Sequence, residues 1–106
     1  MSEDFKRWME YPRFKEWIEH FRDRTTSTDY GNAMAVLFES TGLTPDEFLN
    51  LNPVEAREKA WLVVFTLADS LDRSRALLVR AASKSFYNKM NKCESFIWDS
   101  RKHMIP

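Results

Sequence analysis

Two consecutive helix-start signals constrain the fold of this chain more than any other feature of its sequence. The segments TPDE (44–47) and NPVE (52–55) each place a capping side chain before a proline, with a glutamate three residues after the cap. The capping oxygen accepts a hydrogen bond from a free backbone N–H of the first helical turn. Proline is tolerated at the first helical position because an N–H there would have no partner. The sequence therefore predicts a short helix from 45 to about 50, followed at once by a second helix.

Apolar residues at helical spacing predict two further helices. Between 13 and 24 they recur at i, i+3, i+4 and i+7, which places them on one side of a helix. A helix expected to begin near Thr26 or Thr28, in a run of hydroxyl residues, should end at Gly42, because glycine adopts the left-handed conformation without steric penalty. Residues 1–12 are expected to form an irregular arm that packs through its aromatic side chains.

The second half of the chain contains the two longest expected helices. The helix that follows Asn52 should reach about Leu71, and its wide apolar arc predicts that it lies at the centre of the fold. Ser74 can cap the last helix, from about 75 to 91. With only 2 Gly and 4 Pro but 43% hydrophobic residues, the chain lacks the turn residues of a β-sandwich and has enough apolar residues for a core.

These elements predict an all-α protein, a compact orthogonal bundle of four to five helices. We expect residues 13–98 to form this helical domain and residues 99–106 to be a tail, or the start of a linker to a domain that this chain does not contain. No apolar run approaches the roughly 18 residues of a membrane span, and the N-terminus has no apolar signal-peptide segment. The chain is therefore expected to be cytoplasmic, without membrane contact.

The residues needed for a metal centre or an enzyme active site are scarce. The chain has one cysteine, Cys93, and two histidines, His20 and His103, at spacings that match no zinc motif. It has no glycine-rich phosphate loop and no nucleophile-elbow motif. We therefore expect no catalytic residue, metal or cofactor, and an enzyme is the least favoured class.

Charge is distributed unevenly although the chain has 16 basic and 16 acidic residues. Residues 25–58 carry a net charge of −5 and residues 59–106 a net charge of +5, while residues 73–92 contain six cations and no acid. Arg80, Lys84 and Asn88 follow one another at intervals of four and would form one ridge of the last helix. A helix with cations and short polar side chains on one face can contact DNA phosphates and base edges. A basic face that is merely solvated remains the alternative interpretation.

Several segments together resemble a known family. They are Trp17-Ile18, Thr26 with Tyr30, Leu37-Phe38, the run TGLTPDEFL (41–49), Ser74, Val79-Arg80, Ser83 and Phe86-Tyr87. This arrangement resembles the N-terminal core-binding domain of tyrosine recombinases of the phage-integrase type, a SAM-like helical domain. The segment TGLTPDE (41–47) is especially similar to archaeal-type integrases.

The resemblance implies a DNA-binding domain that forms one half of a clamp around duplex DNA. It implies partners as well: double-stranded DNA, a catalytic domain of the same full-length protein, and neighbouring protomers on the DNA. The family's catalytic residues have no counterpart in this sequence, so strand exchange is not expected of this chain alone. The expected DNA-contacting residues are Arg24, Thr26, Thr28, Tyr30, Arg73, Arg75, Arg80, Lys84 and Asn88. The second hypothesis is a helical protein-interaction domain whose acidic and basic regions are complementary surfaces.

Overall fold

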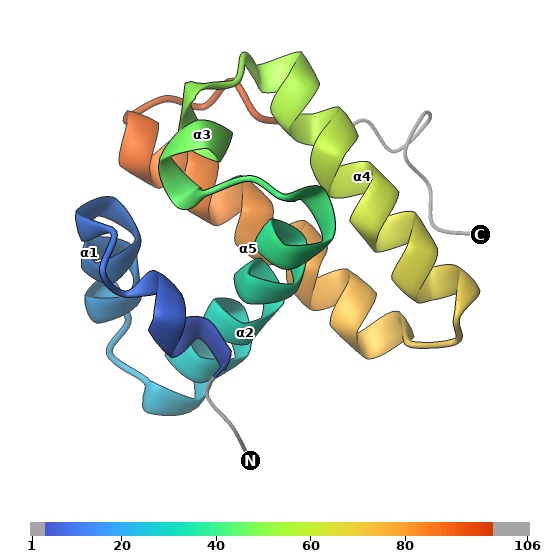
Figure 1. Cartoon of the computed structure of the whole chain (residues 1–106), viewed down its shortest axis with the longest axis horizontal. Helices are drawn as coiled ribbons and strands as arrows, with labels where there is room; N and C mark the ends of the chain where they lie inside the picture. Colours follow the sequence, from blue (N-terminus) through green and yellow to red (C-terminus); the bar gives the residue numbers. More distant parts are fainter. Residues whose placement is uncertain (1–3, 99–106) are drawn as a thin grey trace.

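Helices account for all the regular secondary structure of residues 4–98, the part of the chain that the computed structural model describes (Figure 1). A short 3-10 helix, η1 (Asp4–Trp8), precedes five α-helices. They are α1 (Pro12–His20), α2 (Arg24–Thr41), α3 (Pro45–Asn50), α4 (Pro53–Asp69) and α5 (Arg73–Asn91). The prediction of an all-α bundle is confirmed. The expected tail or linker at 99–106 lies outside the described residues.

The predicted boundaries of α3 are confirmed in atomic detail. The Thr44 hydroxyl accepts a hydrogen bond from the backbone N–H of Glu47 at 3.1 Å, and the Glu47 carboxylate accepts one from the backbone N–H of Thr44 at 2.9 Å. This reciprocal pair satisfies two backbone donors that a helix start leaves free. The side chain of Asn52 caps α4 in a similar way, at 2.8 Å from the backbone nitrogen of Glu55. Gly42 ends α2 with a φ of 75°, in the left-handed region.

The predicted starts lay two to four residues too late for α2 and two residues too late for α5. Asp23 caps α2, accepting hydrogen bonds from the backbone N–H of Thr25 at 3.0 Å and from the hydroxyl of Thr26 at 2.9 Å. Asp72 caps α5, and Ser74 lies inside the helix. A carboxylate in the cap position is favoured over a hydroxyl here because its charge also interacts with the positive end of the helix dipole.

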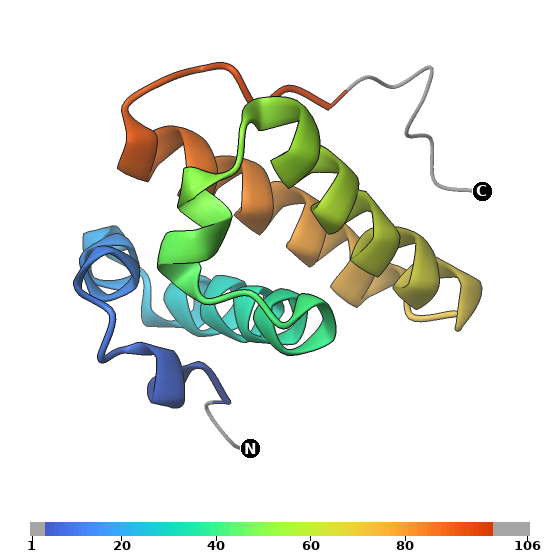
Figure 2. The same ribbon diagram turned by 45° about the horizontal axis from the view of Figure 1, so that its top comes forward.

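The central helix is α5, and the prediction that α4 occupies this place was wrong. α5 packs against α1, α2, α3 and α4, whereas α4 lies beside it on the outside of the bundle (Figures 1 and 2). On α4, Leu62 is 61% exposed and Phe65 is 42% exposed. The small buried residues Ala82 and Ser83 of α5 let neighbouring helices approach its axis closely. The neighbouring helices therefore cover only part of the apolar surface of α4.

Aromatic side chains from four helices meet at the centre of the core. The fully buried ring of Phe86 lies 5.2 Å from that of Trp17, 5.8 Å from Phe14, 6.1 Å from Phe38 and 6.3 Å from Phe48, measured between centroids. Such separations are typical of favourable aromatic packing. Trp17 and Phe14 are on α1, so this cluster fixes α1 against α5.

The N-terminal arm packs on α2 through its aromatic residues, but Asp4–Trp8 form a 3-10 helix where an irregular segment was expected. Phe5 and Trp8 of η1 are buried, and a Cβ atom on Gly31 would lie only 2.7 Å from Cγ of the Phe5 ring. Glycine at this position of α2 therefore makes room for the arm. Among the described helices, none combines the length and the apolar character that crossing a membrane requires.

Candidate nucleic-acid interface

The C-terminal half of α5 presents three exposed lysines, Lys84, Lys89 and Lys92. Residues 73–92 contain no acidic side chain, and within residues 4–98 no carboxylate lies within salt-bridge distance of any of the three. Lys92 ends the helix in the left-handed conformation, with a φ of 53°. Their charges are therefore available to an anionic partner.

α1 extends this basic surface beyond α5. Lys89 Nζ lies 2.6 Å from His20 Nε2, so a hydrogen bond joins α5 to α1. Lys89 also borders two neighbouring hollows: one is lined by Lys15 and His20 of α1, the other by Lys84 of α5. We call Lys15, His20, Lys84, Lys89 and Lys92 the α1–α5 surface. Lys15, His20, Lys84 and Lys89 are continuous because both hollows include Lys89, and Lys92 follows Lys89 by three residues.

Two acidic residues interrupt the α1 side of this surface. Glu16 and Glu19 are exposed and line the same hollow as Lys15 and His20, with Trp17 at its base. Their charges offset part of the positive potential there, including that of Lys89, which lines the same hollow. Lys84 and Lys92 do not line this hollow and are therefore the stronger part of the candidate interface.

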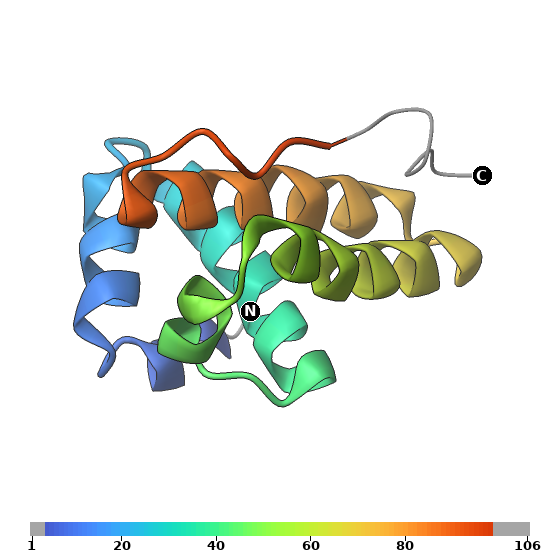
Figure 3. The same cartoon turned by 90° about the horizontal axis from the view of Figure 1, so that it is seen from above.

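The expected ridge of Arg80, Lys84 and Asn88 is partly covered: Lys84 is exposed, whereas Arg80 and Asn88 are half-buried. The guanidinium carbon of Arg80 lies 5.6 Å from the ring centroid of Trp98, whose indole N–H donates to the Arg80 carbonyl oxygen at 2.8 Å. The Asn88 side chain donates to the carbonyl oxygen of Phe96 and accepts from its backbone N–H, both at 3.0 Å. The segment after α5 returns along the helix (Figure 3), and its residues Phe96 and Trp98 make these contacts.

Tyr87 and Asn91 of α5 face the connection between α3 and α4 and not the basic surface. The Tyr87 side chain is 4% exposed, and its hydroxyl donates to the carbonyl oxygen of Leu51 at 2.6 Å. Burial raises the pKa of Tyr87, and the neighbouring Cys93 adds to this effect. The Asn91 amide donates to the carbonyl oxygen of Leu49 at 3.1 Å. The connection from α3 to α4 packs on this side of α5, which helical periodicity alone does not show.

Four residues expected at the interface lie in the first turns of α2: Arg24, Thr26, Thr28 and Tyr30. The carboxylate of Asp23 already caps this end of the helix. Asp23 accepts the hydrogen bonds of Thr25 and Thr26 that a phosphate would require. Arg24 is exposed, and Thr28 lines a hollow together with Phe5 and Lys6.

Tyr30, the fourth of these residues, is partly buried and packs against the aromatic core. Its ring centroid lies 6.3 Å from that of Trp17 and 5.4 Å from that of Phe21. The ring therefore contributes to the packing of α1 on α2.

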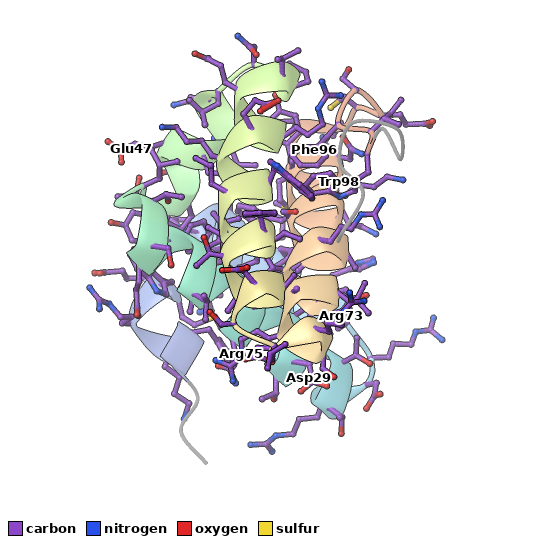
Figure 4. The ribbon with its side chains drawn as sticks, turned by 90° about the vertical axis from the view of Figure 1, so that its right-hand side faces the viewer. Asp29, Glu47, Arg73, Arg75, Phe96 and Trp98 are labelled. Atoms are coloured by element: carbon purple, nitrogen blue, oxygen red, sulfur yellow. The ribbon has the colours of Figure 1, made fainter. Side chains whose placement is uncertain are left out.

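Arg73 and Arg75 lie at the opposite end of α5 from Lys89. Figure 4 shows both side chains at the beginning of the helix, on different sides of it. Arg75 Nε lies 3.8 Å from the carboxylate of Asp72. A helix rises about 1.5 Å per residue, so Arg73 and Lys89 are separated by roughly 24 Å along the axis. The structure thus divides the cations of α5 into two groups.

No metal site accompanies these residues: within residues 4–98, no group of three or more His, Cys, Asp and Glu side chains could hold an ion. Sequence reasoning missed Lys15 and His20, because their proximity to Lys89 depends on how α1 packs against α5. Comparison of the chain with protein-family models, with curated proteins and with solved structures gave no match. The geometry of the α1–α5 surface is therefore the basis for assigning a function.

Proposed function

We propose that this chain binds duplex DNA through the α1–α5 surface. One observation carries the proposal: Lys84, Lys89 and Lys92 are exposed on one helix, and no acidic partner neutralises them within the described residues. Cations of this kind displace counterions from the DNA backbone, and the release of these ions drives binding. The neighbouring Lys15 supplies a further donor to phosphate oxygens.

The contacts should be mainly to phosphates. Arg80 and Asn88, the residue types best suited to reading guanine and adenine, are engaged within the fold. Phosphate contacts position a protein on DNA without reading its sequence. We therefore expect salt-sensitive binding, with a dissociation constant on the order of 10⁻⁴–10⁻⁶ M for duplexes of unrelated sequence.

Resemblance to the core-binding domains of tyrosine recombinases supports the same proposal. In that setting the chain would be a non-catalytic, cytoplasmic DNA-binding module whose partner is a catalytic domain of the same full-length protein. The segments that carry the resemblance include the capping box of α3 and the Phe86-Tyr87 pair of α5. This family assignment is part of the proposal, and DNA binding can be tested independently of it.

The test compares two double variants by fluorescence anisotropy with a labelled duplex of random sequence, over about 50 to 200 mM salt. Replacing both Lys84 and Lys89 with alanine should weaken binding and reduce the slope of log K against log salt by about 1.8, since each phosphate contact contributes about 0.9. The matched control replaces Lys6 and Lys59, two exposed lysines outside the surface. It changes net charge by the same amount and should leave the slope nearly unchanged.

Equal slopes for the two double variants would show that the proposed surface is not the DNA-binding site. Failure of the unmodified chain to bind at low salt, at any accessible concentration, would reject DNA binding altogether. In that case the protein-interaction hypothesis gains support if sedimentation velocity shows self-association that weakens as salt is raised, because complementary charges would then be responsible.

A further inference from the structure

Residues 93–98, which we call the C-terminal strap, are fastened along the side of α5. Phe96 is fully buried and packs against Tyr87, with ring centroids 5.5 Å apart, and against Trp98 at 5.3 Å. From α4, the Arg57 guanidinium donates to the carbonyl oxygen of Ile97 at 3.1 Å. Figure 4 shows Phe96 and Trp98 beside the upper part of α5. The strap therefore has contacts with two helices.

The strap offers Asn88 the same pair of groups that adenine offers in the major groove. Adenine presents one donor, its N6 amino group, and one acceptor, N7, to an asparagine side chain. Phe96 presents its backbone N–H to Asn88 Oδ1 and its carbonyl oxygen to Asn88 Nδ2, each at 3.0 Å. Both ends of the amide are thus occupied by the strap, and the side chain cannot hydrogen-bond to a base at the same time.

The strap also engages the one arginine in the middle of α5. Trp98 holds Arg80 in two ways, through its indole N–H on the carbonyl oxygen and through its ring near the guanidinium group. Lys84 is exposed and lies one helical turn from Arg80 on one side and from Asn88 on the other. Arg80, Lys84 and Asn88 would form a continuous ridge on α5 if the strap were displaced.

We propose that the C-terminal strap is an autoinhibitory contact: it covers Arg80 and Asn88, and bound DNA must displace it before these residues can contact DNA. This inference rests on the proposed DNA binding by α5. With the strap in place, binding is limited to phosphate contacts by the lysines. With the strap displaced, Arg80 adds a charged contact and Asn88 becomes able to hydrogen-bond to a base.

The test uses the full chain with Trp98→Ala, which removes both contacts to Arg80. Affinity for the random duplex should rise about fivefold, and the salt slope should steepen by about 0.9 because Arg80 gains a phosphate. The gain should disappear when Arg80→Ala is added to the same chain. Ile97→Ala is the matched control, since Ile97 is a strap residue whose side chain is 58% exposed. It should bind as the unmodified chain does.

A second measurement needs no substitution. Amide hydrogen exchange of the unmodified chain should show the Phe96 N–H protected without DNA and less protected at saturating DNA. If Trp98→Ala remains folded and binds no more tightly, or if DNA leaves Phe96 protected, the strap is only structural and the autoinhibition proposal is wrong. If neither the unmodified chain nor Trp98→Ala binds DNA, the proposed DNA binding is wrong as well. Failure of the autoinhibition proposal alone would leave the unmodified chain able to bind DNA.

Discussion

Replacing Phe86 with alanine tests the conclusion that α5 is the central helix. The side chain is fully buried, and four aromatic rings from α1, α2 and α3 lie between 5.2 and 6.3 Å from it. Removing a buried phenylalanine typically costs about 3–5 kcal/mol, because the lost transfer free energy is added to the cost of the cavity. A ring surrounded on all sides by other rings leaves a space that backbone relaxation cannot easily fill.

This loss is large compared with the total stability of such a domain. A chain of this size typically unfolds with a free energy of about 5–15 kcal/mol. A melting temperature changes by roughly 4–8 °C for each kcal/mol in a domain of about 100 residues. We therefore expect Phe86→Ala to lower the melting temperature by at least about 12 °C, measured by circular dichroism, and to lower the urea midpoint in proportion.

The matched control is Phe65→Ala on α4, which removes the same atoms from a side chain that is 42% exposed. Because this ring is only partly removed from water, its loss should cost no more than about 1.5 kcal/mol. If Phe65→Ala destabilised the protein as much as Phe86→Ala, then α4 would be the buried central helix that the sequence pattern predicts. The reasoning about α5 would then be refuted.

Three further predictions concern single groups. Gly42→Ala should lower the free energy of unfolding by about 1–2 kcal/mol in urea titrations, because the φ of 75° is unfavourable for a residue with a Cβ atom. Thr44→Ala should cost about 1 kcal/mol by the same measurement, since it removes the acceptor for the backbone N–H of Glu47; Glu47→Gln, which keeps the return hydrogen bond, should cost less. Ultraviolet titration should show Tyr87 ionising above the ordinary tyrosine pKa of about 10. Because its pKa is raised in the folded state, the stability that Tyr87 contributes is present below pH 10 and is lost as pH rises through the folded pKa. Unchanged ionisation of the folded chain would contradict the burial of this hydroxyl, and Tyr87→Phe should remove that part of the pH dependence.

The sequence predicted helices better than their positions in the bundle. The starts of α3 and α4 and the end of α2 were correct because each depends on side chains within four residues of the boundary. The starts of α2 and α5 were missed because nearby hydroxyl groups competed with Asp23 and Asp72 as caps. Local sequence does not decide between two capping residues that both fit.

The candidate site was predictable only in part. Residues 73–92 were known from the sequence to be basic, and Lys84 was correctly placed on the exposed side of its helix. The engagement of Asn88 by Phe96 joins residues eight positions apart across the end of α5, and the contact of His20 with Lys89 joins residues 69 positions apart. Neither contact has a periodic signal in the sequence.

The amino-acid sequence was enough to show that this chain is helical, where α3 and α4 begin, where α2 ends, and which segment carries positive charge without acid. These properties follow from interactions between residues a few positions apart. Tertiary structure decided that α5 and not α4 is central, because burial depends on how many neighbours surround a helix. It also decided which cations reach solvent, because the strap and α1 approach α5 from distant parts of the chain.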